Sequence, residues 1–265
     1  MVLAAIALAV VTGAQDRTAP DGAKAADAEP TVDQILNHYI ASLGGRSAIE
    51  RITSRASLGE IEVPSMNLSG TVMIHEKAPD KLLQVVVING NAFRQGFDGT
   101  NGWSDDPADG LRLFAGIELD EAKRDADFFH PLHLREIYPD LRFAGKEKLS
   151  SSANDLGAAH PTTAGEVYEL EGTAAGESRP DEMYFDIESG LASRLISHRH
   201  TADGESDVQE DFSDYRNVDG LQLPFTIVQT GGSAAFTIHL AGIHQGVNLD
   251  DSEFAAPQAR TSAVQ

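Results

Sequence analysis

Residues 218–227, VDGLQLPFTI, combine a tight turn with a strand that has a single apolar face. Side chains alternate between the two faces of a strand, and every second residue after Asp219-Gly220 is apolar. The residues on this apolar face are Leu221, Leu223, Phe225 and Ile227. A strand of this kind must bury one side against the rest of the protein, so the stretch predicts a sheet with a covered face.

The same unit of strand and turn recurs through the last third of the chain. Dipeptides that favour turns stand between runs rich in β-branched and aromatic residues, which predicts successive antiparallel hairpins. These dipeptides are Ser189-Gly190, Asp203-Gly204, Asp219-Gly220 and Gly231-Gly232. On the strand after residue 231, the side chains predicted to face the same interior are Phe236, Ile238 and Leu240.

Strands are also predicted from about residue 54 onward. Here the interior positions are taken to be Leu68, Val72, Ile74, Val85 and Val87. The run 81–88, KLLQVVVI, is apolar on both faces except at Gln84, so we expect it to be covered on both sides. Trp103 is the only tryptophan, and we expect it to pack rather than to line a cavity mouth.

Helical spacing appears in two places. Thr31 is a good N-cap for a helix that ends at Gly44-Gly45, and a second short helix follows. In the middle of the chain, a helical pattern reaches Phe129 and is interrupted by His130-Pro131 before a second piece begins at Leu132. We expect this pair to cover the sheet, either as a lid around Phe129 and Leu132 or as a fixed cover.

Together these patterns predict a mainly β (α+β) fold. We expect a curled, unclosed antiparallel β-barrel with helices covering its open concave side. The expected organisation is a signal peptide at 1–14, a flexible leader at 15–30, one half-barrel domain at 31–257 and a disordered tail at 258–265. The alternative for the apolar N-terminus is a buried helix.

Composition excludes several classes of function. The formal net charge is -21, with 41 acidic and 20 basic residues, which disfavours nucleic acids and anionic membrane surfaces. The absence of cysteine excludes disulfides, thiolate metal sites and cysteine nucleophiles. We expect an exported, soluble, periplasmic monomer without a stable membrane anchor.

No motif for catalysis or for a cofactor is present, so we expect a protein that is not an enzyme and binds no cofactor. His198 and His200 would share a strand face, but their run supplies no third ligand, and a solvated face is favoured over a metal site. Pro131 spoils the helical geometry of His130 and His133, for which capping or surface roles are favoured. We therefore predict no metal site.

Four phrases resemble a known superfamily over residues 31–257. They are FDGTNGW (97–103), YFDIESGLASRLIS (184–197), DYRNVDGLQLPFTI (214–227) and GVNLDDSEFAAP (246–257). The chain resembles the periplasmic lipoprotein-sorting and carrier proteins with a LolA-like fold. This resemblance implies an unclosed β-barrel whose concave apolar face lies beneath helices, and none of the functional residues of the family can be matched here.

The function that we expect is binding or carriage of lipoprotein acyl chains, or of another lipid, against that concave face. The expected partners are the acyl chain and an envelope protein that donates or accepts it. The alternatives are a solid core without a cavity, an envelope stress sensor or interaction module with the same fold, and a hydrolase at the sheet edge. The predicted ligand-binding residues are the interior positions named above together with Phe129 and Leu132.

Overall fold

The structure is a computed structural model that describes residues 29–149, 165–201, 204–232 and 234–258. The predicted signal peptide, most of the predicted leader and all but the first residue of the predicted tail lie outside the described residues. These ranges contain four helices: α1 (Val32–Leu43), α2 (Arg46–Arg51), α3 (Ile117–Asp125) and α4 (His130–Ile137). Two short 3-10 helices are η1 (Pro64–Met66) and η2 (Asp251–Phe254).

Thirteen strands form one antiparallel sheet. The first six are β1 (Ser54–Val63), β2 (Leu68–Lys77), β3 (Lys81–Ile88), β4 (Asn91–Phe97), β5 (Gly102–Asp106) and β6 (Gly110–Leu113). The others are β7 (Arg142–Leu149), β8 (Gly165–Gly172), β9 (Asp181–Asp186), β10 (Ala192–Thr201), β11 (Gly204–Val218), β12 (Leu221–Gly231) and β13 (Phe236–Gln245). Their order is β6-β5-β4-β3-β2-β1-β13-β12-β11-β10-β9-β8-β7.

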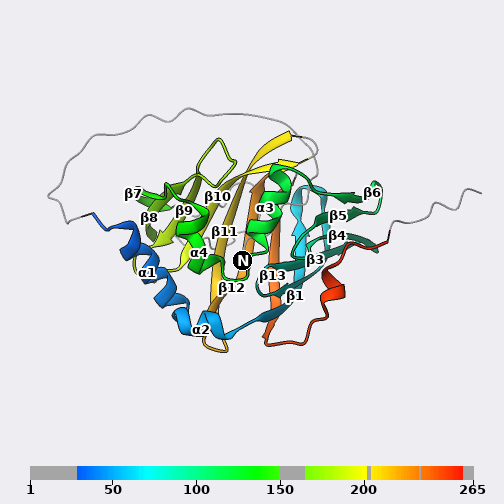
Figure 1. The fold of residues 1–265 in the computed structure, drawn as a ribbon, viewed down its shortest axis with the longest axis horizontal. Helices are drawn as coiled ribbons and strands as arrows, with labels where there is room; N and C mark the ends of the chain where they lie inside the picture. Colours follow the sequence, from blue (N-terminus) through cyan, green and yellow to red (C-terminus); the bar gives the residue numbers. More distant parts are fainter. Residues whose placement is uncertain (1–28, 150–164, 202–203, 233, 259–265) are drawn as a thin grey trace, which may run out of the picture.

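The first and last strands of the chain, β1 and β13, pair at the middle of this sheet and join two meanders. The edge strands β6 and β7 do not pair with each other, so the curled sheet stays open. Figure 1 shows α3 and α4 lying across the concave side, with α1 beside them. The predicted fold class, a curled and unclosed antiparallel sheet with covering helices, is confirmed.

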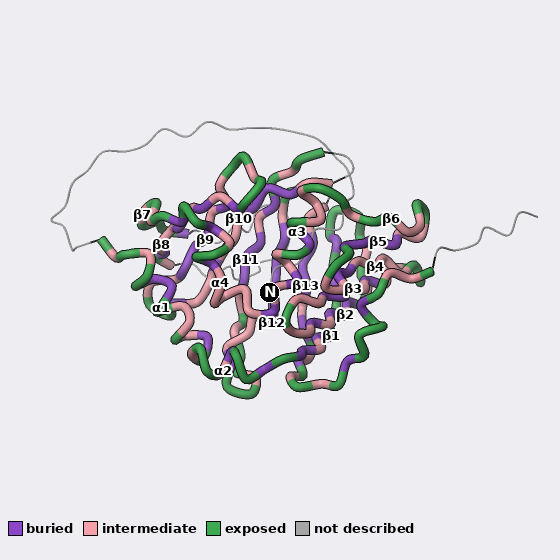
Figure 2. The backbone as a smooth tube through the Cα atoms, viewed as in Figure 1, coloured by how far each residue is buried: buried purple, intermediate pink, exposed green. Residues whose placement is uncertain are grey.

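The alternating pattern at 218–227 produces the centre of the core. Ile227 of β12 pairs with Ile238 of β13, which in turn pairs with Ile61 of β1. The three side chains are at most 2% exposed and stack across three strands. Full burial of such a side chain stabilises the fold by roughly 1.5–3 kcal/mol. Figure 2 shows buried residues concentrated in these central strands.

Helix α1 begins and ends where the sequence predicts. The Thr31 hydroxyl accepts a hydrogen bond from the Gln34 N–H at 3.2 Å, and the Gln34 side chain accepts one from the Thr31 N–H at 2.8 Å. Gly44 follows the helix with a φ of 124°. A Cβ at Gly44 would lie 2.2 Å from the Gly220 carbonyl oxygen, so glycine allows α1 to contact the β11–β12 turn.

The interruption between α3 and α4 differs from the prediction. Helix α3 already ends at Asp125, and His130-Pro131 begins α4 instead of breaking a helix. Proline suits the first turn of a helix because its missing N–H would have no partner there. The Asp127 side chain accepts from the Phe129 N–H at 3.0 Å and holds the connecting segment.

Both faces of β3 are covered, as predicted, but the prediction that Val85 and Val87 face the concave interior is wrong. Val86, not Val85, lies beside Val72 in the core of the concave side. Val85 packs on the opposite face, against a cluster that contains Trp103 and Phe254, and alternation places Val87 on that face too. The C-terminal η2 segment covers this convex face, and Trp103 is a packing residue there, as predicted.

Candidate functional site

Most of the predicted ligand-binding residues form the packed interior. Eight of them are at most 7% exposed: Val72, Ile74, Leu221, Phe225, Ile227, Phe236, Ile238 and Leu240. Leu68 and Leu223 are partly buried against the same core. Phe129 and Leu132 pack at the helix ends, against a cluster that includes Leu221.

A small cavity lies between this cluster and the α3–α4 connection. Its volume is about 80 Å³, and its lining includes Phe128, Pro131, Leu221 and Leu223. Pockets for small molecules have volumes of roughly 300–1,000 Å³. An acyl chain would enter here only if the covering helices moved away, so binding at these predicted residues stays a prediction.

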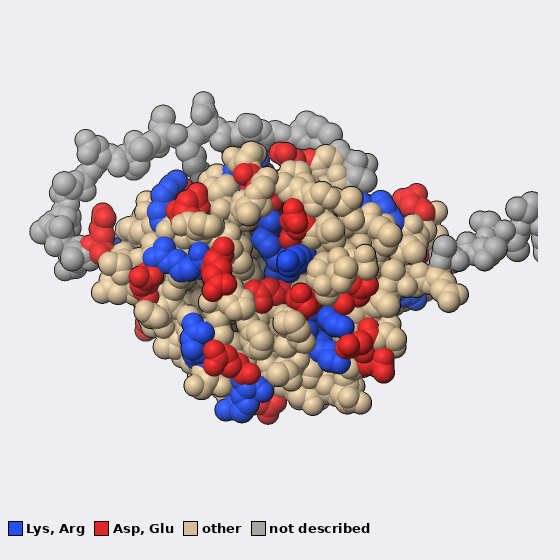
Figure 3. All heavy atoms as spheres, in the orientation of Figure 1, with Lys and Arg blue, Asp and Glu red and all other residues tan. Residues whose placement is uncertain are grey.

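A larger cleft opens between α3, strands β4–β6 and the end of β10. Its volume is about 530 Å³, which falls within the range of ligand pockets. None of the predicted ligand-binding residues lines it. Phe93, Phe114 and Ala122 form its apolar wall; Ala122 belongs to the core, and Phe93 and Phe114 pack against it. Figure 3 shows acidic and basic side chains gathered in the middle of the same face of the molecule.

The apolar wall of the cleft depends on a glycine in β5. A Cβ at Gly102 would lie 2.6 Å from Phe114 Cδ2 and 3.2 Å from the Ala122 Cβ. Glycine therefore allows Phe114 and helix α3 to pack directly on the strand. The Phe114 N–H also donates to the Gly102 carbonyl at 2.8 Å, which fixes the chain at the end of β6.

Charged groups of the cleft are organised as ion pairs. Arg94 lies 3.3 Å from Asp105, and Arg112 contacts Glu118 at 2.6 Å. Six carboxylates and three arginines line the cleft, so its charge is net acidic. A cleft of this kind favours neutral or amphiphilic ligands over strongly anionic ones.

A buried amide also faces the cleft. The side chain of Gln84 is on the concave side of β3, and the residue is 2% exposed. Its Oε1 accepts from Gln95 Nε2 at 2.8 Å, whereas its Nε2 has no hydrogen-bond partner among the described residues. A buried donor without a partner is costly, so this amide is suited to an acceptor oxygen of a ligand.

The inner end of the cleft contains a buried arginine. Arg199 Nη1 donates to both carboxylate oxygens of Asp125 at 3.0 Å, and Arg199 Nε donates to Ser197 Oγ at 3.2 Å. Burial lowers the pKa of Arg199, but the charges of Asp125 and Glu210 outweigh that effect and raise it. The guanidinium therefore stays charged although the residue is only 7% exposed.

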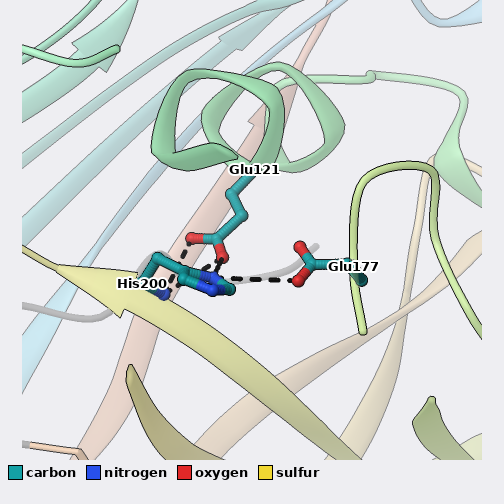
Figure 4. A group of neighbouring side chains, drawn as sticks. All are labelled: Glu121, Glu177 and His200. Atoms are coloured by element: carbon teal, nitrogen blue, oxygen red, sulfur yellow. Dashed lines mark hydrogen bonds and ion pairs between the residues drawn. The ribbon is translucent and has the colours of Figure 1, made fainter. Parts of the chain in front are cut away.

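His200 follows Arg199 in β10, and Figure 4 shows its ring beside the carboxylates of Glu121 and Glu177. Its Nδ1 is 2.7 Å from Glu121 Oε1 and 3.7 Å from Glu177 Oε2, and its Nε2 is 3.1 Å from Glu205 Oε1. Burial raises the pKa of Glu121. Burial also lowers the pKa of His200, but the hydrogen bond to Glu121 and the neighbouring charges raise it overall.

The two histidines of β10 do not act as a pair. His198 Nδ1 contacts Asp207 at 2.7 Å and its Nε2 contacts the Pro180 carbonyl at 2.9 Å, and the residue is buried. The solvated strand face predicted for it is therefore wrong. The donors that were missing from the sequence run come to His200 from distant segments: Glu121 and Glu177 each bring a carboxylate oxygen within 4.8 Å of its ring nitrogen.

The sequence contained one signal for this region. Glu121 and Asp125 are four residues apart and so share one face of a helix, and both side chains are at most 6% exposed. That spacing indicates a shared helix face, and in the structure this face is turned toward β10 of the sheet. Gln84 was also marked, as the one polar residue between Leu82 and Ile88, whereas Glu177 carried no comparable signal.

Comparisons with known proteins extend to the fold only. No family model matches the chain, and no curated protein sequence matches it. A DUF1329 family protein from Desulfovibrio piger aligns over 84% of this chain and 97% of its own, with 14% identity and a TM-score of 0.53.

None of the helices in the described residues is both long and apolar enough to cross a membrane.

Two further solved structures have the same fold. A putative outer membrane lipoprotein-sorting protein domain from Vibrio parahaemolyticus aligns over 78% of this chain and 93% of its own, with 13% identity and a TM-score of 0.50. The LolA superfamily protein NE2245 from Nitrosomonas europaea aligns over 86% and 98%, with 12% identity and a TM-score of 0.50. The LolA-like fold expected from the sequence is therefore confirmed.

Proposed function

We propose that this protein is an exported, periplasmic binding or carrier protein for an amphiphilic ligand with an apolar chain, such as a lipoprotein acyl group or another lipid. The observation that carries the proposal is the 530 Å³ cleft beside α3, which has an apolar wall and a polar inner end. The LolA-like fold and the predicted export signal support the same assignment.

In this proposal, the apolar part of the ligand lies against Phe93, Phe114 and Ala122. The Gln84 amide donates to an oxygen of the ligand, and the charged rim stays in contact with water. Burial of about ten methylene groups at ~0.8 kcal/mol each would contribute roughly 8 kcal/mol, which corresponds to a Kd of about 1 μM. An affinity of this order allows a monomeric carrier to receive a ligand from one envelope component and release it to another.

The charges of the cleft support binding rather than catalysis. Arg94, Arg112 and Arg199 each contact a carboxylate, so each arginine is held by a partner of opposite charge. A paired arginine positions its partner and supplies neither a nucleophile nor a base. A protein that is not an enzyme is therefore the proposed class.

The proposal is tested by purification under native conditions, organic extraction and mass spectrometry. We expect a lipid or acyl compound to copurify with the wild type and to be lost from Phe114→Arg, which places a charge on the apolar wall. The matched control is Leu113→Arg, because the neighbouring Leu113 is 59% exposed and does not line the cleft. A wild-type protein that is empty and takes up no acyl probe would contradict the proposal and favour the interaction-module alternative.

A further inference from the structure

We propose that Glu121, Glu177 and His200 form a binding site for one Zn²⁺ ion at the inner end of the cleft. The three residues come from α3, the β8–β9 connection and β10, and their donor atoms lie within 4.8 Å of one another. A histidine nitrogen with carboxylate oxygens is a donor set that Zn²⁺ accepts. Three protein ligands would leave a fourth position for water or ligand.

The His200 ring has a carboxylate at each of its nitrogens, Glu121 at Nδ1 and Glu205 at Nε2. If Nε2–H donates to Glu205, then Nδ1 of a neutral ring directs a lone pair at Glu121 Oε1, only 2.7 Å away. Two lone pairs at that distance would repel, so a proton lies between them, and a bound Zn²⁺ ion would take the place of that proton. A metal-bound histidine characteristically donates its other ring N–H to a carboxylate, which is the role that Glu205 would have.

Both carboxylates have an oxygen to offer. Glu177 Oε1 accepts from Arg124 Nη2 at 2.7 Å, while its Oε2 is the oxygen that faces His200. Glu121 is held by the His200 N–H, which is 3.0 Å from Oε1 and 3.3 Å from Oε2. Bonds of about 2.0 Å to a tetrahedral ion require about 3.3 Å between donor atoms, so the His200–Glu121 contact must widen by a small rotation of the side chains.

The charge of the surroundings also favours a divalent cation. Four carboxylates lie here, those of Glu121, Glu177, Glu205 and Asp125, and the nearby guanidinium groups are Arg124 and Arg199. Two negative charges are uncompensated when His200 is neutral. Since the side chains of Glu121 and Glu177 are 6% and 3% exposed, water compensates them poorly, and a Zn²⁺ ion would balance the charge.

The test is a titration of the full chain, stripped of metal by dialysis against a chelator, with Zn²⁺ in competition with a chromophoric chelator. We expect one ion per chain with a Kd near or below about 1 μM. His200→Ala and Glu177→Gln should each weaken binding by at least about 100-fold, and Glu205→Gln by about 10- to 100-fold. The matched control His244→Ala removes an exposed histidine of β13 and should bind as the wild type does.

Circular dichroism establishes that each variant is folded, and Glu177→Gln keeps the side-chain size if His200→Ala fails to fold. Co²⁺ in place of Zn²⁺ should give visible absorption bands of a low-coordinate site in the wild type and none in Glu177→Gln. Wild-type protein without bound metal at about 100 μM Zn²⁺, or His200→Ala with unchanged affinity, would overturn the proposal. These measurements use no acyl probe, so their outcome is independent of the proposed ligand function.

Discussion

The guanidinium of Arg199 on β10 bonds to both carboxylate oxygens of Asp125 on α3, and both side chains are more than nine-tenths buried. This pair joins the covering helix to the sheet across 74 positions of sequence. It also closes the inner end of the cleft, since both residues belong to its lining. The position of α3 over the sheet therefore depends on a buried electrostatic contact in addition to apolar packing.

Removal of one partner should be strongly destabilising. Asp125→Ala leaves the Arg199 charge buried without its main partner, which costs about 3–5 kcal/mol in the free energy of unfolding. Arg179→Ala is the control, because its ion pair with Asp207 has side chains that are 49% and 57% exposed and should contribute no more than about 1 kcal/mol. Urea denaturation measures both values, and equal losses would contradict the role given to the buried pair.

Asp181 should make stability depend on pH. Burial raises the pKa of its carboxyl, and a hydrogen bond from the Tyr138 hydroxyl at 2.8 Å offsets part of that rise. Because the pKa of the carboxyl is higher in the folded protein than in the unfolded chain, the protonated carboxyl stabilises the fold. This stabilisation is full below the unfolded-state pKa and is lost as pH rises through the folded-state pKa. The asparagine side chain does not titrate, so the free energy of unfolding of Asp181→Asn relative to that of the wild type should increase from about pH 4 upward and then level off. Urea unfolding at several pH values measures this difference, and a constant or falling difference would count against it.

The C-terminal segment should stabilise the sheet through Trp103. Its indole N–H donates to the Phe254 carbonyl at 2.9 Å, and the Phe254 side chain is fully buried in the same cluster. Phe254→Ala should cost about 3–5 kcal/mol and should shift the emission of the only tryptophan to longer wavelength. Leu58→Ala, at a position that is 53% exposed, should change neither property by much. An unchanged emission spectrum in Phe254→Ala would show that η2 does not cover Trp103.

Gly102 should control the shape of the cleft. Gly102→Ala would bring a methyl group to 2.6 Å from Phe114, so the ring and α3 must shift, at a cost of about 1–3 kcal/mol. Weaker binding of an acyl probe should accompany the loss of stability. Gly145→Ala is the control, since nothing lies within 4 Å of the added carbon. If Gly102→Ala binds the probe with full affinity, the ligand does not lie against the cleft wall formed by Phe114 and α3.

The strand faces could be predicted where the sequence alternates. At 218–227 and at 236–240 one face is apolar and the other is not, so the residues alone indicate which side is buried. In β3 both faces are apolar, and the pattern cannot distinguish Val85 from Val86. Only the position of the C-terminal segment, which depends on the whole fold, shows that Val85 faces away from the concave side.

The cleft and its charged inner end could not be predicted from local patterns. Arg199 and His200 are flanked by polar residues and resemble a solvated strand, because their partners Asp125 and Glu121 lie more than 70 positions away. Cleft volume is a property of how helices pack on a sheet, and side-chain periodicity carries no information about it. Outside β3, the apolar strand faces lie in the interior as predicted, but their packing fills most of the space that a ligand would need.

A titration with a fluorescent fatty acid tests most directly whether the ligand lies in the cleft beside α3. Phe114→Arg should weaken binding at least about 10-fold, or about 1.4 kcal/mol. Leu113→Arg, outside the cleft, and Leu223→Arg, beside the small cavity, should bind as the wild type does once shown to be folded. Loss of binding in Leu223→Arg with full affinity in Phe114→Arg would place the ligand beneath the helices and contradict the assignment to the cleft.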